Sequence, residues 1–389
     1  SNPATPYVHT FETMVPLVDD FVKRGYFGII LTGGEPSLHP ELPRIAGYAR
    51  DQGLHVRMIT NGWRLAEDDF ARDMAEAGLQ HVHISVYSIY PEVEERLRGI
   101  PNTLGRAYAA VQNANKYGIT VNINCVISKL NAAHLDENIE FWIKEHPYIR
   151  HFIWNNLDPS MGRAEVNQDE YTPRLSDFEV SLRRAMKLLD DSGRTFRVEK
   201  VPLCYMTDYA WASTEARKIV KGEERIVHFL DNKQTVRQTD WGHIYSEACN
   251  ICSLRNICGG LFDQGEGYDP AELYPVFVSQ DAIVEKIIQD PMDPSYKLRT
   301  LEEWKRDFDR RLHEQREASE SREPKEHPAK LVKDGISVGF VTEESKKKWE
   351  VKRRAEGRIA SRIGVAQELT DVSEVGDDGS GEKTQVEAS

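Results

Sequence analysis

The sequence has few cysteines, no excess of basic residues and no long apolar run. Only 5 of its 389 residues are cysteine, which is too few for a disulfide-built scaffold. The formal net charge of -13 argues against binding to duplex nucleic acid, because such binding normally requires a basic face. No apolar run reaches the roughly 18 residues of a membrane span, and the opening residues lack the features of a secretory signal. These absences predict a cytoplasmic protein with no membrane partner.

Strand-like and helix-like segments alternate between residues 11 and 156. The apolar runs of strand length are 26–33, 54–62, 81–88, 120–128 and 149–156, and helical spacing of apolar residues fills the intervals. This order predicts an α/β fold in which helices join the strands of a parallel sheet. Ligands of such folds bind where the carboxyl ends of the strands meet. The polar and glycine residues at these ends are Gly33, Gly34, Glu35, Thr60, Asn61, Gly62, Ser85–Ser88, Ser128, Asn155 and Asn156.

The first strand end reads ILTGGEP. Gly33 and Gly34 carry no side chains at a point where the backbone bends or lets a ligand approach closely. Glu35 then places a carboxylate beside that point. The same tripeptide is also compatible with a plain tight turn. Further along the chain, Tyr87 and Trp154 are candidates to line a substrate pocket at the same edge.

One short run, CNICSLRNICGG, contains three of the five cysteines. Cys249, Cys252 and Cys258 have the spacing C-x2-C-x5-C, and Cys204 lies upstream as a candidate fourth ligand. Soft metals bind clustered thiolates, and a C-x2-C turn places two of them on one side of the metal. The spacing is compatible with zinc and with an iron–sulfur cluster. Cys125 stands alone in a predicted strand and is interpreted as a core residue.

Taken in order, these motifs resemble those of the radical S-adenosylmethionine (radical SAM) superfamily. The resemblance covers about residues 1–275 and is closest to members with a C-terminal auxiliary-cluster extension of the SPASM or twitch type. LTGGEP is similar to the GGE motif of the family. This implies that Gly33, Gly34 and Glu35 hold the methionyl amino group of S-adenosylmethionine.

Three other segments are similar to family motifs near the nucleotide. ITNG implies that Thr60 and Asn61 lie beside the ligand. ISVYS implies that Ser85 lies near the ribose or the carboxylate, with Tyr87 where the family usually has an aspartate. DPSMGRA implies cofactor contacts from Gly162 and Arg163.

The cysteine run matches the core of the SPASM pattern, although Phe262 stands where the next cysteine of that pattern falls. The resemblance therefore implies one auxiliary [4Fe–4S] cluster, held by Cys204, Cys249, Cys252 and Cys258. The C-x3-C-x2-C triad, which holds the radical-generating [4Fe–4S] cluster of the family, is absent from this sequence. We expect that triad and the first barrel strand to precede Ser1. We also expect the chain without them to be inactive in cleavage.

The resemblance implies a partial (β/α)6 TIM-like barrel whose first strand is missing. We expect this barrel at 1–165, an auxiliary-cluster extension at 166–285, a charged helix at 286–320 and a largely disordered charged tail at 321–389. The implied enzyme cleaves S-adenosylmethionine to a 5′-deoxyadenosyl radical and abstracts a hydrogen from a peptide or protein. A small-molecule substrate from cofactor biosynthesis is the alternative. Its electron donor would be a protein such as flavodoxin or ferredoxin.

A second interpretation requires no catalysis. The chain could be a degenerate barrel that binds a peptide partner, with a structural zinc ion at its C-terminal cysteines. Metal content distinguishes the two interpretations, because the enzyme requires iron and sulfide.

Overall fold

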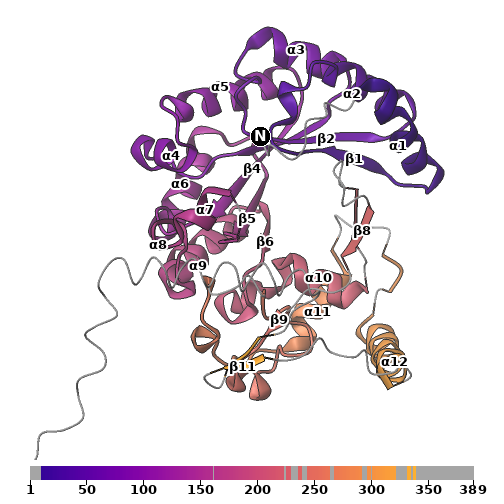
Figure 1. The fold of residues 1–389 in the computed structure, drawn as a ribbon, viewed down its shortest axis with the longest axis vertical. Coiled ribbons are helices and arrows are strands. Elements are labelled where there is room, and N and C mark those ends of the chain that lie inside the picture. Colours follow the sequence, from indigo (N-terminus) through magenta and orange to yellow (C-terminus); the bar gives the residue numbers. More distant parts are fainter. Residues whose placement is uncertain are drawn as a thin grey trace, which may run out of the picture. The chain divides into compact units, whose positions relative to one another are not determined.

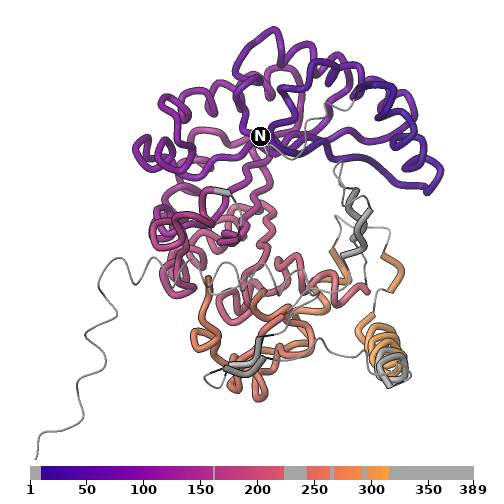
Figure 2. Tube along the Cα trace, viewed as in Figure 1, coloured from indigo at the N-terminus to yellow at the C-terminus, as the bar shows by residue number. Residues whose placement is uncertain are grey.

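The computed structural model describes residues 10–160, 162–222, 225–228, 235–238, 243–262, 267–290, 296–298, 300–320, 331–333 and 336–338. The chain divides into two units, Ser1–Phe308 and Asp309–Ser389. Figure 2 follows the described backbone of the first unit from the N-terminal helix to the cysteine-containing segment. Among the described helices, none has the length and hydropathy needed to cross a bilayer.

Six parallel strands form one unclosed sheet in the first unit (Figure 1). They lie in sequence order: β1 (Gly28–Leu31), β2 (His55–Thr60), β3 (His81–Ser85), β4 (Thr120–Ile127), β5 (His151–Asn156) and β6 (Thr195–Glu199). The predicted α/β class and the five predicted strands are confirmed. Strand β6 was not predicted, and it pairs with β5 so that the sheet continues beyond residue 165.

The helices between the strands also follow the predicted order. They are α1 (Phe11–Lys23), η1 (Pro36–Leu38), α2 (Leu42–Asp51), α3 (Asp68–Glu76), α4 (Pro91–Arg98), α5 (Thr103–Lys116), η2 (Ala132–His134), α6 (Leu135–Glu145), α7 (Gly162–Val166), α8 (Gln168–Tyr171) and α9 (Leu175–Asp191).

The two faces of the sheet differ because side chains alternate along each strand. One face is apolar and packs against helices such as α2 and α5, with Val56, Ile84 and Phe196 in the core. Trp154 belongs to this face and is 2% exposed, so the prediction that it lines a substrate pocket is wrong. The opposite face, here called the polar face, carries His83, Ser85, Asn124, Asn155 and their lateral neighbours.

The rest of the first unit contains short elements around the cysteines. They are η3 (Leu203–Tyr205), η4 (Thr207–Ala212), α10 (Thr214–Lys221), β7 (Arg225–His228), β8 (Thr235–Gln238), β9 (His243–Ile244), η5 (Glu247–Ile251), β10 (Leu261–Phe262), η7 (Pro270–Glu272) and α11 (Gln280–Ile288). Strands β7 and β8 pair antiparallel, as do β9 and β10.

The predicted charged helix is α12 (Leu301–Glu320), which crosses the boundary between the two units. Of the predicted tail, the structure describes only β11 (Leu331–Lys333) and β12 (Ile336–Val338), which pair antiparallel. The remainder of 321–389 lies outside the described residues, so its predicted disorder stays a prediction.

Candidate active site

Glu35 connects the carboxyl ends of β1 and β2. Its Oε1 accepts hydrogen bonds from the Ser37 amide at 3.1 Å and the Ser37 hydroxyl at 2.6 Å. The Thr60 hydroxyl donates to the same oxygen at 2.5 Å, and the Asn61 amide donates to Oε2 at 2.7 Å. Because Oε2 accepts only this one bond from the described residues, it can accept another from a cationic donor such as an ammonium group.

The backbone around Glu35 explains the glycine that precedes it. Gly33 has a φ of +150°, a conformation that side chains rarely adopt, so glycine is required there. On the adjacent strand, Thr60 is buried and its hydroxyl oxygen also accepts a bond from the Gly62 amide at 3.1 Å. The Asn61 side chain accepts a bond from the Trp63 amide at 2.8 Å. Both strand ends are therefore held in a fixed conformation.

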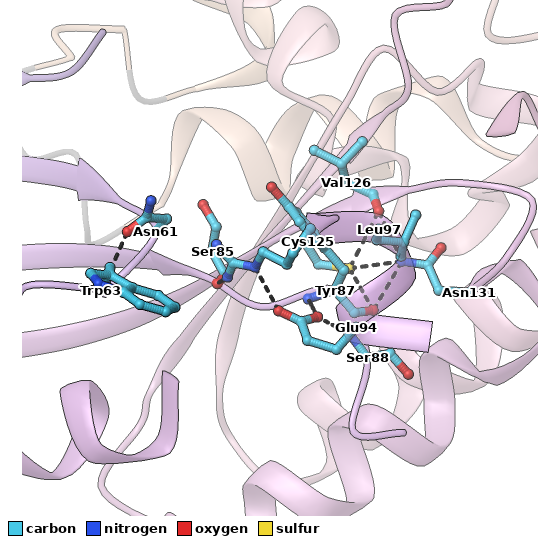
Figure 3. A network of polar contacts seen from close by, with 12 residues as sticks. Asn61, Trp63, Ser85, Tyr87, Ser88, Glu94, Leu97, Cys125, Val126 and Asn131 are labelled. Carbon is cyan, nitrogen blue, oxygen red and sulfur yellow. Dashed lines mark hydrogen bonds and ion pairs between the residues drawn. The ribbon is translucent and has the colours of Figure 1, made fainter. Parts of the chain in front are cut away.

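A buried ion pair fixes the end of β3 (Figure 3). Glu94 Oε2 accepts bonds from the amides of Tyr87 at 2.7 Å and Ser88 at 2.9 Å. Its Oε1 pairs with Arg98 Nε at 2.8 Å, and the two side chains are 0% and 9% exposed respectively. Arg98 also donates to the Ser85 carbonyl. The helix α4 thereby holds the segment that carries Ser85 and Tyr87.

Two cavities lie at this edge of the sheet and share Tyr87, Leu97 and Arg163 in their linings. The arginine cavity, of about 230 Å³, is also lined by Asn61, Trp63, Arg98, Ile100, Thr103 and Arg106. The tyrosine cavity, of about 200 Å³, is also lined by Val126, Ser128, Leu157, Ala164 and Tyr171. Residues from the ends of β2, β3, β4 and β5 thus meet here, as the parallel sheet predicts.

The arginine cavity contains donors that lack acceptors among the described residues. Arg106 stacks on the Trp63 ring at 4.2 Å, and its Nη2 donates to the Trp63 carbonyl at 2.7 Å and pairs with Glu67 at 3.4 Å. Its buried Nε, however, has no partner within the described part of the chain. The same holds for the buried hydroxyl of Thr103, the first residue of α5, and Asn102 makes no side-chain cap on this helix. A helix amino terminus, a hydroxyl and a guanidinium Nε together suit an anionic group such as a carboxylate.

Arg163 lies on the other side of the same cavities. Gly162 begins α7, and the Arg163 guanidinium donates to the Leu97 carbonyl. A side chain at Gly99 would collide with this guanidinium, because its Cβ would lie 2.2 Å from Arg163 Nη1. The glycine therefore leaves the space in which Arg163 lies.

The four C-terminal cysteines line one separate small cavity of about 20 Å³. The Gly260 amide donates to Cys258 Sγ at 3.2 Å, and the Val276 amide donates to Cys252 Sγ at 3.5 Å. Burial, with a smaller effect of nearby thiolates, raises the pKa of the Cys204 thiol to about 12. Burial likewise raises the pKa of Cys258. Four grouped thiols with amide donors aimed at sulfur are a donor set suited to a soft metal or an iron–sulfur cluster.

Within the described residues, no three His, Cys, Asp or Glu side chains converge closely enough to hold a single ion. A cavity of about 20 Å³ likewise requires the cysteine side chains to move apart around a cluster. The four thiols are therefore a donor set for zinc or for an iron–sulfur cluster once the side chains adjust, because both accept four thiolates.

Tyrosine hydroxyls connect the cysteine segment to the sheet and its helices. Tyr268 donates to Asn156 Oδ1 at 2.9 Å and to the Leu157 carbonyl at 2.8 Å. Tyr274 donates to the Cys204 carbonyl at 2.8 Å and to Glu179 at 2.6 Å. These bonds attach the region after the cysteines to the end of β5 and to α9.

The predicted site residues thus form two groups, one at the strand ends and one made of the four cysteines around their cavity. In the first group, Glu35, Thr60 and Asn61 are joined by hydrogen bonds and are preceded by Gly33 and Gly34. Asn61 also shares a cavity with Arg163. Ser85 is connected to this group through Arg98. Sequence reasoning missed Trp63, Thr103, Arg106 and the Glu94–Arg98 pair. Of these residues, only the Glu94–Arg98 pair has a recognisable sequence pattern, which is an acid and a base four residues apart on a helix.

Buried histidines on the polar face predict a pH-dependent stability. Burial, with a smaller effect of His81, lowers the pKa of His83 to about 3. Burial, with a smaller effect of Arg197, lowers the pKa of His151 to about 4. In the unfolded chain these histidines bind a proton near pH 6.5, whereas in the folded protein they remain neutral to lower pH. The folded state therefore keeps its full stability above about pH 6.5 and loses stability as the pH falls toward the folded-state pKa values.

We expect acidification from about pH 6.5 to about pH 5 to lower the free energy of unfolding by about 2 kcal/mol for each of these histidines. Urea unfolding across this range measures the slope. The variant His83→Gln should flatten it, whereas His313→Gln, on the exposed side of α12, should leave it unchanged. An identical slope in His83→Gln and the wild type would contradict this assignment.

Comparison with known proteins finds a family match for the N-terminal part of the chain. Residues 1–141 match the profile of the radical SAM superfamily. The chain is similar to the Fe-coproporphyrin III synthase of Methanosarcina barkeri, with 29% identity over 153 residues that cover 39% of this chain and 38% of that protein. It is also similar to the PqqA peptide cyclase of Rhizobium meliloti, with 26% identity over 191 residues that cover 48% of each.

The chain therefore spans less than half the length of these two curated relatives. Among solved structures, it overlaps with Streptococcus suis SuiB bound to S-adenosylmethionine at a TM-score of 0.44 and 15% identity. That overlap covers 51% of this chain and 45% of SuiB.

Proposed function

Because residues 1–141 match the profile of the radical SAM superfamily, we propose that the protein binds S-adenosylmethionine and uses it to abstract a hydrogen atom from a peptide substrate. The observation that carries this proposal is the pair of oppositely charged groups around Asn61. Its amide contacts Glu35, which can accept a cation, and its side chain lines the arginine cavity, which suits an anion. An amino-acid group, such as the methionyl end of S-adenosylmethionine, has this distribution of charge.

Residues of the chain would bind and orient the nucleotide. Glu35 Oε2 would accept a bond from the amino group, while Arg106 and the start of α5 would bind the carboxylate. Gly162 and Arg163 would contact the nucleotide from the other wall. The family uses a [4Fe–4S] cluster, which supplies the electron that cleaves S-adenosylmethionine to methionine and a 5′-deoxyadenosyl radical.

Cys204, Cys249, Cys252 and Cys258 would hold an auxiliary [4Fe–4S] cluster in the extension. Their arrangement around one cavity and the amide donors on two of the sulfurs support this assignment. An external protein such as flavodoxin or ferredoxin would supply electrons. A structural zinc in a non-catalytic, peptide-binding barrel remains the second candidate function, because zinc accepts the same four thiolates.

The relatives support two substrate classes. One acts on the PqqA peptide by its name, and another is an Fe-coproporphyrin III synthase. We favour a peptide because the match to a peptide cyclase extends over 191 residues, against 153 residues for the Fe-coproporphyrin III synthase. A small molecule from cofactor biosynthesis is the alternative within the enzyme class.

Glu35→Gln tests the nucleotide site. We expect it to weaken binding of S-adenosylmethionine by about 10- to 100-fold, because a charge-assisted hydrogen bond contributes about 1.5–3 kcal/mol. Equilibrium dialysis with labelled nucleotide measures the affinity. The exposed carboxylate of Glu12 offers a matched control, and Glu12→Gln should bind like the wild type. Equal affinity in all three proteins would overturn the assignment of Glu35.

Metal analysis separates the enzyme from the zinc protein. After anaerobic purification, we expect iron and acid-labile sulfide that are lost together from Cys258→Ser. For a chain that carries the C-x3-C-x2-C segment upstream of Ser1, we also expect 5′-deoxyadenosine on reduction. One zinc per chain, without iron and without nucleotide cleavage, would instead support the peptide-binding barrel.

A further inference from the structure

A basic cluster lies on the amino half of the polar face, away from the strand ends described above. It consists of His55 and Arg57 on β2 and His81 and His83 on β3, with Arg57 directly opposite His81. The rings of His81 and His83 stack with their centroids 5.0 Å apart, and His55 meets His81 edge-on at 6.2 Å. The proposed function assigns no role to these four side chains.

Two buried side-chain nitrogens of the basic cluster, Arg57 Nε and His81 Nε2, have no hydrogen-bond partner within the described part of the chain. A guanidinium Nε–H can only donate, so whatever satisfies it must be an acceptor. Among the described residues, no carboxylate pairs with Arg57, and burial alone lowers the pKa of Arg57. A part-buried charge without a counter-ion is costly.

Three other part-buried arginines of the first unit have such counter-ions, whereas the buried Arg194 donates to the carbonyls of Ile149 and Pro147. Arg98 pairs with Glu94 at 2.8 Å. Arg197 and Arg217 both pair with Asp290, at 2.9 Å and 2.7 Å. Arg57 differs from these three in having donors and a charge but no acceptor within the described part of the chain.

We propose that the basic cluster is an oxyanion-binding site, in which Arg57 and His81 donate hydrogen bonds to a carboxylate or phosphate group. Such a ligand supplies both the missing acceptor and the missing negative charge. Beside the cluster, Phe27 stacks on His55 and is itself 77% exposed. This site does not depend on binding of S-adenosylmethionine.

Imidazole signals provide a direct test. The whole chain, labelled at histidine, is titrated at constant ionic strength with sodium phosphate, sodium acetate or sodium chloride, and its histidine resonances are followed by NMR. We expect phosphate or acetate, but not chloride, to shift the signals of His81 and His83 in a saturable manner. Saturation by phosphate alone identifies a phosphate ligand, and saturation by acetate identifies a carboxylate.

Variants assign the effect to Arg57. We expect Arg57→Met to weaken the anion response at least tenfold, and Arg57→Lys, which keeps the charge but loses Nε, to give an intermediate affinity. Arg72→Met removes an arginine from the surface of α3 and should bind like the wild type. If Arg57→Met loses its dispersed histidine signals through unfolding, Arg57→Lys alone decides. Shifts no larger than those with chloride, or an unchanged affinity in Arg57→Lys, would overturn the proposal.

Discussion

Replacing Glu94 with glutamine is expected to lower the free energy of unfolding by about 3–5 kcal/mol, the usual cost of breaking a buried ion pair. The carboxylate is fully buried and accepts the amides of Tyr87 and Ser88 while pairing with Arg98. A glutamine amide cannot accept all three bonds, and it leaves the guanidinium without its counter-ion. Urea unfolding measures the loss.

Two further variants test whether the loss of stability comes from the Glu94–Arg98 ion pair. Glu92→Gln, at an exposed position of the same helix, should change stability by less than about 0.5 kcal/mol. Adding Arg98→Met to Glu94→Gln should recover part of the loss, because the unpaired charge is then removed as well. A Glu94→Gln protein as stable as Glu92→Gln would show that the ion pair does not hold the end of β3.

Gly260→Ala is expected to destabilise the cysteine segment by about 3 kcal/mol, from backbone strain and overpacking together. Gly260 has a φ of +66°, and a Cβ there would lie 2.7 Å from the Tyr245 ring and 2.8 Å from the Ile244 carbonyl oxygen. The displacement would also break the bond from the Gly260 amide to Cys258 Sγ.

Thiol reactivity reports this change without any metal. In the metal-free protein, Cys204 is buried and Cys258 is half-buried, and burial raises the pKa of both thiols, so both should react slowly with Ellman's reagent. Gly260→Ala should accelerate the reaction and lower the unfolding midpoint. Gly105→Ala, where nothing lies within 4 Å of the added Cβ, should do neither. Unchanged thiol kinetics in Gly260→Ala would contradict the structural role of this glycine.

The spacing of apolar residues, and the polar residues and glycines at the ends of apolar runs, predicted much of the sheet and part of the site. Five strands and the grouping of Glu35 with Thr60 and Asn61 follow from apolar runs that end in polar residues, because parallel strands place these ends at one edge. The missed strand β6 begins only four positions after the end of α9, so its alternation was hidden by the longer helical pattern.

Other features depend on tertiary placement that a sequence does not reveal. Trp154 was assigned to the strand mouth by its position near the end of β5, but its side chain alternates onto the covered face. Arg106 lies on a helix far from the strand motifs and reaches the site only because α5 packs beside β3. Arg57 has no sequence signature, since its lack of a partner is a property of the packed sheet.

The hydroxyl of Tyr268 connects the segment after the cysteines to the tyrosine cavity. It binds Asn156 and the Leu157 carbonyl at the end of β5, and Leu157 also lines the tyrosine cavity. A shift of the segment after the cysteines would therefore be transmitted to that cavity. If the thiols bind a metal, its binding and the occupancy of the cavity would influence each other by the same factor.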